Sequence, residues 1–357
     1  MNQNSRTNFS PDSPYRRLAA ALDALPNRYP PAEDESDLYL LAKIFTPEEA
    51  ALAALLKPAM ETPAEISERL GLEMRPTTLL LKEMAKKGLI QLGKTEQGRL
   101  GFGIMPFVVG IYEAQIGRID AEMAQLFEDY YQKSFGKSLN IQPQVHRVIP
   151  VKESIPNTME IHPYESVTDL ITQAGSWGVV DCICRTQQAL IGNPCEHPLD
   201  VCMVLSEKPQ AFDNNSTIRA LSFEEAQNTL QRAANVGLVH CVSNQQEAIW
   251  YICNCCTCSC AILRGMAEIG VANMVASSSF INTVNPDLCL ACGTCVPVCQ
   301  FNALELNDVI TVNEIRCVGC GVCVPVCPEE ALHLIRRENE SIPPKYETDW
   351  QQARTVH

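Results

Sequence analysis

The cysteines near the C-terminal end follow a repeated spacing. Two runs of the form C-x2-C-x2-C-x3-C are present, and 28 residues separate their first members: Cys289, Cys292, Cys295 and Cys299, then Cys317, Cys320, Cys323 and Cys327. Val-Pro-Val precedes the last cysteine of both runs. Thiolates at such spacing bind soft metals or iron–sulfur clusters, and a duplicated eight-cysteine pattern favours clusters over zinc ribbons or disulfides.

This double run resembles the bacterial two-cluster [4Fe-4S] ferredoxins, over residues 282–337. The resemblance implies that each cluster takes three ligands from one run and the fourth from the other. One cluster would be held by Cys289, Cys292, Cys295 and Cys327, and the other by Cys317, Cys320, Cys323 and Cys299. The chain departs from the family at Gln300, where proline is usual.

A second group of cysteines predicts a further metal site. Four of them fall within a short segment: Cys182, Cys184, Cys195 and Cys202. They suit a tetrathiolate site for an iron–sulfur cluster, with zinc and a structural or redox-active thiol group as alternatives. Arg185 could donate to a cluster sulfur, whereas His197 is expected to be an ordinary loop residue.

A third group lies in the segment 253–260, with Cys241 upstream. Neighbouring residues of an extended chain point to opposite sides, so these cysteines cannot all face one ion. The expected ligands are Cys253 and Cys256 with Cys258 or Cys260, while Cys241 and Cys255 suit buried positions. A further cluster, a contribution to the Cys182 group and a redox-active thiol pair all remain open.

The middle and terminal patterns together resemble multi-cluster 4Fe-4S proteins of anaerobic bacteria that carry an N-terminal region like a winged helix. That resemblance implies a redox function with several clusters. At least one cluster beyond the two of the ferredoxin-like segment is therefore expected.

The elements that must position these cysteines indicate an α+β multidomain chain. We expect a loosely ordered leader (1–37), a winged helix-turn-helix-like domain (38–110), a connecting helix and strand (111–165), a cysteine-rich α+β region (166–281), the ferredoxin-like domain (282–337) and a polar tail (338–357).

Capping residues support the winged-helix order. Thr46-Pro47-Glu48-Glu49 and Thr62-Pro63 begin helices, a third helix fits 75–87, and glycines punctuate a hairpin over 90–107. Further on, we expect a helix over 111–134, strands over 145–151 and 177–180, and a helix over 223–236 that Ser222 and Glu225 cap.

Charge lowers the expectation of nucleic-acid binding. The chain carries a net charge of −14 from 28 basic and 42 acidic residues, which suits a redox partner with a basic face better than a polyanion. In the winged-helix segment, candidate DNA contacts are Arg75, Thr77, Thr78, Lys82, Lys86 and Lys87. Acidic residues are about as frequent there, which favours docking of a protein over DNA.

The remaining patterns exclude several function classes. No secretory signal, no transmembrane segment and no dinucleotide or Walker loop is recognised in the sequence, so we expect a cytoplasmic chain without a nucleotide cofactor. The leading hypothesis is an iron–sulfur electron-transfer protein, a partner or subunit of an anaerobic oxidoreductase rather than a complete enzyme. The alternatives are a redox-sensing DNA-binding regulator and a reductase centred on the middle cysteines.

Overall fold

The computed structural model describes residues 9–156, 158–268, 273–338 and 342–355. The chain divides into two compact units, residues 1–138 and residues 139–357. The division falls inside the segment expected to connect the winged-helix and cysteine-rich regions. No helix in the described part of the chain combines the length and the apolar character needed to cross a bilayer.

The first unit is mainly helical. Its main elements are α1 (Pro14–Asp23), α2 (Ser36–Ile44), α3 (Pro47–Ala53), α4 (Pro63–Leu70), α5 (Met74–Lys86), β1 (Gln91–Lys94), β2 (Leu100–Gly103) and α6 (Ala121–Tyr130). Capping boxes of Thr46 with Glu49 and of Thr62 with Glu65 begin α3 and α4, as predicted. The expected order of three helices and a hairpin is therefore present, with β1 and β2 antiparallel.

Two expectations for this unit are wrong. The leader is not loosely ordered in its described part, because α1 buries Leu18 and Leu22; its first eight residues lie outside the described part. The long helix over 111–134 is interrupted, since Gly117 adopts a positive φ of 82° and Asp120 caps a new helix by accepting from the Met123 N–H at 2.8 Å. In its place the structure has a short 3-10 turn, Glu113–Gln115, then α6 and a further helical turn, Tyr131–Phe135.

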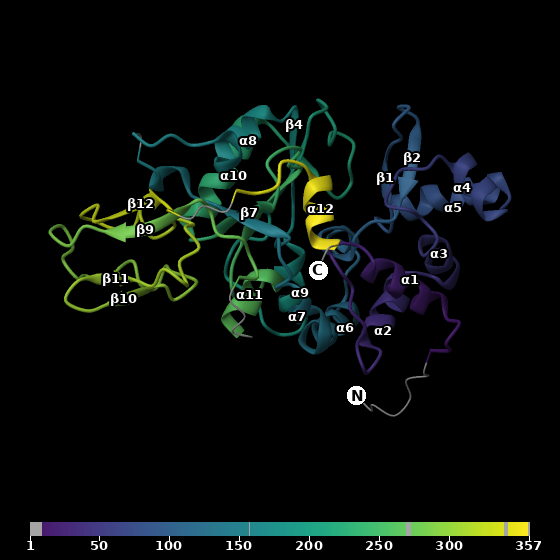
Figure 1. Ribbon diagram of the computed structural model, residues 1–357, viewed down its shortest axis with the longest axis horizontal. Coiled ribbons are helices and arrows are strands. Elements are labelled where there is room, and N and C mark those ends of the chain that lie inside the picture. Colours follow the sequence, from purple (N-terminus) through teal and green to yellow (C-terminus); the bar gives the residue numbers. More distant parts are fainter. Residues whose placement is uncertain (1–8, 157, 269–272, 339–341, 356–357) are drawn as a thin grey trace. The chain divides into compact units, whose positions relative to one another are not determined.

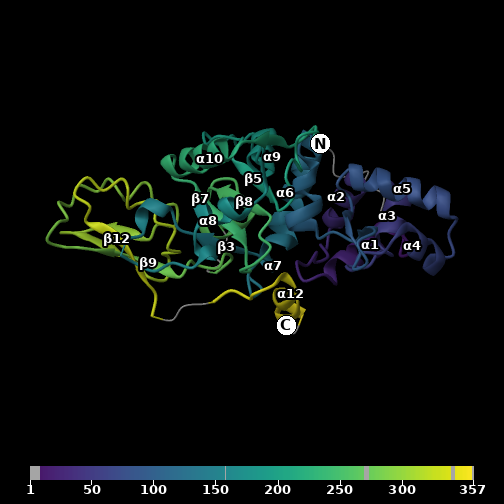
Figure 2. The same ribbon diagram turned by 90° about the horizontal axis from the view of Figure 1, so that it is seen from above.

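The second unit is built on an antiparallel six-stranded sheet with the order β3-β7-β8-β5-β4-β6. The strands are β3 (His146–Ile149), β4 (Ser176–Val180), β5 (Cys202–Ser206), β6 (Arg219–Leu221), β7 (Val239–Ser243) and β8 (Tyr251–Cys255). The helices α8 (Val167–Gln173) and α10 (Phe223–Asn235) lie side by side (Figures 1 and 2) and pack with the sheet into one apolar core. The strands over 145–151 and 177–180 and the capped helix over 223–236 are thus confirmed.

Two more helices begin at the cysteines of this unit. Cys182 caps α9 (Ile183–Leu190), and Cys260 immediately precedes α11 (Ala261–Glu268). A helix N-terminus carries a partial positive charge and favours thiolates beside it. The sheet and these helices therefore bring cysteines to one end of β4, β5 and β8.

The ferredoxin-like segment forms two strand pairs (Figure 1). β9 (Phe280–Val284) pairs with β12 (Leu332–Arg336), and β10 (Leu304–Leu306) pairs with β11 (Ile310–Val312). Beyond it, the expected polar tail forms α12 (Glu347–Thr355), where Trp350 donates to the Gln144 carbonyl at 2.9 Å and Arg354 is buried. Residues 339–341 and 356–357 of that tail lie outside the described part.

Candidate metal centres

The outer set comprises the four cysteines that line one small cavity: Cys289, Cys292, Cys295 and Cys327. Burial raises the pKa of Cys295, and the charges of the Cys327, Cys292 and Cys289 thiols raise it further. Cys292 is exposed, and Leu290, two residues before it, is 69% exposed. Four thiols around a shared cavity at the surface fit a cubane cluster.

The inner set comprises the other four cysteines of the double run: Cys317, Cys320, Cys323 and Cys299. Burial raises the pKa of Cys320 to about 12, and the neighbouring Cys317 and Cys299 thiols contribute. Cys320 and Cys323 are both buried, unlike Cys292 in the outer set. The structure therefore places each fourth cysteine with the triple of the other run, and the inner set is the better shielded of the two.

The two runs also share a backbone conformation. Gly293 and Gly321 both have positive φ, at 73° and 72°, and the equivalent positions Ala291 and Gly319 have φ of 51° and 69°. In each half, a backbone N–H four residues after the last cysteine donates to its sulfur at 3.3 Å. N–H donors to ligand sulfurs are one way in which a protein tunes cluster potential.

These observations agree with the comparison with known families. Residues 288–331 match the 4Fe-4S dicluster domain. The protein therefore carries two [4Fe-4S] clusters, and its other cysteines leave room for a further one. No curated protein and no solved structure matches the chain.

The inner set is joined to the six-stranded sheet through its loop. The Val151 N–H donates to the Cys320 carbonyl at 2.9 Å, and the Ser154 hydroxyl donates to the Gly321 carbonyl at 2.6 Å. From the other side, the Ser278 hydroxyl donates to the Gly319 carbonyl at 2.7 Å. The inner ligand loop is thus enclosed by the body of the unit, which accounts for its burial.

Gln300 makes a second connection between the ferredoxin-like segment and the middle cysteines. Its Oε1 accepts from the Thr257 N–H at 2.7 Å, and its Nε2 donates to the Gly237 carbonyl. Thr257 stands between Cys256 and Cys258, and Gln300 follows the inner ligand Cys299. A proline could make neither bond, so the departure from the family has a structural reason.

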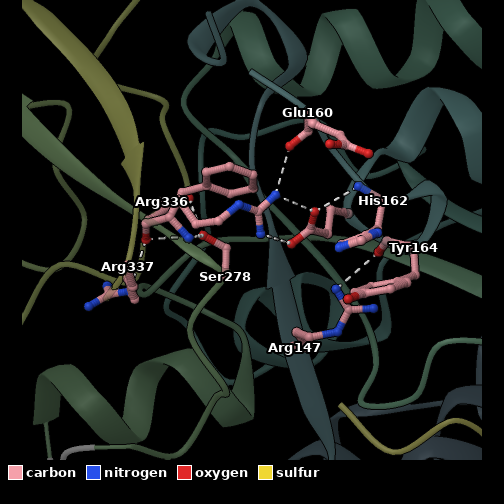
Figure 3. A network of polar contacts seen from close by, with 10 residues as sticks. Arg147, Glu160, His162, Tyr164, Ser278, Arg336 and Arg337 are labelled. Carbon is pink, nitrogen blue, oxygen red and sulfur yellow. Dashed lines mark hydrogen bonds and ion pairs between the residues drawn. The ribbon is translucent and has the colours of Figure 1, made fainter. Parts of the chain in front are cut away.

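Charged side chains make a third connection (Figure 3). Arg336 at the end of β12 donates from both terminal nitrogens to the Glu165 carboxylate, each at 3.0 Å, and to the Glu160 carbonyl at 2.8 Å. Arg337 points the other way, where it donates to the carbonyls of Phe280 and Cys317. The last strand of the ferredoxin-like segment is therefore fixed to the segment that precedes α8 and, on its other side, to the inner ligand Cys317.

The middle cysteines form two separate groups. The first, here called the thiol ring, is a closed series in which each thiol shifts the pKa of the next or has its own pKa shifted by it: Cys182, Cys184, Cys260, Cys255, Cys253 and Cys202. Cys241 contacts the ring through Cys255. Antiparallel pairing explains the gathering, because β4 ends where β5 begins and where β8 ends.

The thiol ring has a member with a lowered pKa and a cation beside it. Hydrogen bonds with Cys184 and Cys202 hold the pKa of Cys182 well below its usual value, and Arg185 adds to this shift. Burial would lower the pKa of Arg185, but the charges of Cys182, Cys256 and other nearby thiols raise it overall. Arg185 is fixed by donating to the carbonyls of Asn254 at 2.7 Å and Pro198 at 3.0 Å. A buried thiol-rich site with a fixed cation fits a negatively charged cluster.

The second group, here called the quartet, contains Cys195, His197, Cys256 and Cys258. Their ligand atoms all lie within 4.8 Å of one another. The His197 ring lowers the pKa of Cys256 to about 6, against the effect of burial. In turn, hydrogen bonding to Cys256 raises the pKa of His197 to about 9.

The quartet and the ring change the grouping predicted from sequence. Cys195 was expected with Cys182, Cys184 and Cys202, but the structure places it with Cys256 and Cys258. The expected subset of Cys253, Cys256, Cys258 and Cys260 is likewise divided between the two groups. The loop after α9 carries Cys195 away from the strand end that holds Cys182.

Sequence reasoning left one member of these groups undecided and missed another. Cys255 was left open between a buried apolar position and a ligand role, and it is buried and belongs to the ring. His197 was expected to be an ordinary loop residue, yet it belongs to the quartet. A signal for Cys255 was available, because Cys253 and Cys255 are two apart on a strand and so share one face. For His197, no signal beyond its proximity to Cys195 exists.

Proposed function

We propose that the protein transfers single electrons between a redox partner protein and a cluster held by the thiol ring, as a component of an anaerobic oxidoreductase. The difference in exposure between the outer and inner sets is the observation that carries this proposal. Bound [4Fe-4S] clusters supply reversible one-electron exchange at low potential. The exposure of the cysteines in each set determines which cluster a partner can approach.

In this proposal the partner binds beside the outer set. Cys292 is exposed, and the exposed apolar side chains Leu288 and Leu290 flank Cys289. A small apolar patch beside a redox centre allows a partner to approach closely and dissociate quickly, as transient redox complexes require. The acidic chain favours a partner with a basic face.

The inner set connects the outer set to the middle of the unit. Its ligand Cys299 is followed by Gln300, which bonds to Thr257, and Thr257 lies between ring members Cys255 and Cys260 in sequence. The carbonyls of its other ligand loop accept bonds from Val151 and Ser154. These bonds hold the two regions in fixed relation, which efficient electron transfer requires.

The test compares two exposed side chains on the ferredoxin-like segment. Leu290→Glu alters the patch at the outer set, whereas Ile315→Glu alters a side chain that is 85% exposed near the first ligand of the inner run. Reduction by a chemically reduced ferredoxin is followed by stopped-flow absorbance, with iron and acid-labile sulfide measured in each protein. We expect at least four irons per chain beyond the eight of the dicluster domain, and slower reduction only in Leu290→Glu.

Two results would overturn the proposal. One is equal reduction rates for Leu290→Glu and Ile315→Glu in proteins with full iron content. The other is an iron content no greater than that of the two dicluster-domain clusters, because the ring would then hold none.

A reductase centred on the ring is a second candidate, favoured by the fixed cation Arg185 next to the low-pKa Cys182. Such an enzyme would bind substrate at the ring and receive electrons from the inner set. A substrate would then perturb the EPR signal of the ring centre and leave those of the dicluster domain unchanged. Electron transfer alone predicts no small molecule that does so.

The N-terminal unit supports a winged-helix interpretation with a docking role. Glu61 forms an antiparallel bridge with Phe102, so a short strand segment between α3 and α4 joins the β1–β2 hairpin. Of the candidate DNA contacts, Thr77 is buried and Lys87 forms an ion pair with Glu49 at 2.6 Å. The exposed residues Leu72 and Met74 instead suit protein docking. A specific, cluster-dependent DNA complex would favour the regulator hypothesis over this one.

A further inference from the structure

We propose that the quartet of Cys195, His197, Cys256 and Cys258 binds a single tetrahedral Zn²⁺ ion, separate from every iron–sulfur centre of the chain. The site goes beyond the proposed electron transfer, since zinc exchanges no electrons. It is argued from the distances between the four ligand atoms, their chemical types and the loops that carry them.

The distances fit one small ion. The Cys195 sulfur lies 3.2 Å from the Cys258 sulfur and 3.8 Å from the Cys256 sulfur. The His197 Nδ1 lies 3.0 Å from the Cys195 sulfur and 3.9 Å from the Cys258 sulfur. Four ligands around zinc, with Zn–S near 2.3 Å, give sulfur–sulfur separations of about 3.8 Å.

The same distances do not suit a cubane. Each cysteine of a [4Fe-4S] cluster binds a different iron, so ligand sulfurs stand on the order of 6 Å apart. All four ligand atoms of the quartet lie within 4.8 Å of one another. The donor set of three thiolates and one imidazole is also a common structural zinc set, whereas the clusters of the dicluster domain use cysteine alone.

The quartet joins two loops that have no regular secondary structure of their own at this point. Cys195 and His197 lie after α9, and Cys256 and Cys258 lie between β8 and α11. The Cys256 side chain packs in a small apolar cluster with Val201 and Leu238, which Cys195 also contacts. Two pairs, C-x-H and C-x-C, thus converge from segments far apart in sequence, as structural zinc sites commonly do.

The position of the quartet indicates a structural role. Its ligands Cys256 and Cys258 flank Thr257, whose N–H donates to Gln300 of the ferredoxin-like segment. Both also lie between ring members Cys255 and Cys260 along the chain. Four protein ligands leave no open position for substrate, so the ion stabilises the loop that supports both the ring and the ferredoxin contact.

The test measures zinc and iron in the full-length holoprotein purified without oxygen. We expect one Zn²⁺ per chain, and zinc-edge X-ray absorption with three sulfur ligands and one nitrogen ligand. In His197→Gln and Cys258→Ser, EDTA should remove the zinc at a concentration at least ten-fold lower than in the wild type. The control His333→Gln, in β12, should match the wild type.

The wild-type coordination measurement does not depend on whether a variant folds. Zinc absent from the wild type, a zinc shell of other composition, or equal zinc retention in His197→Gln, Cys258→Ser and the control would each overturn the proposal. So would a lower iron content with unchanged zinc in His197→Gln, because the quartet would then hold an iron centre. Iron and sulfide counts that stay constant while zinc is lost separate this proposal from the electron-transfer proposal.

Discussion

The duplicated ligand loops offer two equivalent positions at which substitution should have unequal effects on stability. Ala291 and Gly319 occupy the same place in the two runs, and both have positive φ. A Cβ added at Gly319 would stand 2.0 Å from the Phe280 carbonyl oxygen and 2.3 Å from the Ser278 hydroxyl. The Phe280 carbonyl is held in place, since Arg337 donates to it at 2.9 Å. The loop must therefore move away from its neighbours.

The magnitude of the Gly319→Ala effect follows from two contributions. Left-handed backbone costs an alanine about 1–2 kcal/mol relative to glycine. Moving the loop also breaks the bonds from the Ser278 hydroxyl and N–H to the Gly319 and Val318 carbonyls, each contributing about 1 kcal/mol. We expect Gly319→Ala to destabilise the inner ligand loop by about 3–4 kcal/mol.

The reverse change, Ala291→Gly, removes left-handed strain but adds freedom to the unfolded chain, so its effect should stay within about 1 kcal/mol. The assay is release of iron in increasing guanidinium, followed by cluster absorbance and by EPR of the reduced protein. Gly319→Ala should lose the inner-set signal at a lower denaturant concentration than the wild type, and Ala291→Gly should not. Equal midpoints for the two variants would refute the steric reasoning.

Three more perturbations test other parts of the second unit. Burial lowers the pKa of His146 to about 4. As pH falls below 6.5, the imidazole therefore becomes protonated in the unfolded chain before it does so in the folded protein. The free energy of unfolding should fall by up to about 3 kcal/mol by pH 4. His146→Phe should flatten that pH profile, and an unchanged slope would contradict it. Arg336 holds the pKa of Glu165 below its usual value despite burial, so the ion pair stabilises the folded state above about pH 4.5 and this stabilisation is lost at lower pH. Glu165→Gln should therefore lower the free energy of unfolding by about 1–2 kcal/mol at neutral pH, measured by denaturant titration. An unchanged free energy of unfolding would argue against the ion pair. Gln300→Leu should cost about 1–2 kcal/mol while leaving the iron content unchanged, because the Thr257 N–H loses its acceptor; loss of iron would show that Gln300 instead supports ligation.

Local sequence signals predicted the elements that need no distant partner. Capping boxes such as Thr46 with Glu49 mark helix starts through bonds within four residues, and they are present. The strand before Cys182 followed from its apolar residues and ends as expected at Val180. The dicluster pattern is equally local, since all eight of its ligands lie within two short runs.

The parts that the sequence could not predict depend on tertiary contacts. Cys195 and Cys256 are separated by 61 residues, and only the pairing of β5 with β8 and the path of the loop after α9 bring their sulfurs to 3.8 Å. Nothing near Trp350 in sequence indicates that its indole donates to Gln144 across 206 residues. Thr77, which the sequence offered as a candidate DNA contact, is buried by the packing of its own unit.

The unequal shielding of the two dicluster ligand sets has a consequence for damage by oxygen. Oxidants reach exposed cluster sites first. Among the eight ligands, Cys292 of the outer set is exposed, and the nearby Leu290 is exposed as well. In the inner set, Cys320 and Cys323 are buried. A brief encounter with air would then remove the group nearest the partner and spare those deeper in the unit. In the proposed function, the protein would be disconnected from its partner before its interior centres were lost, and repair would need to rebuild only the surface cluster.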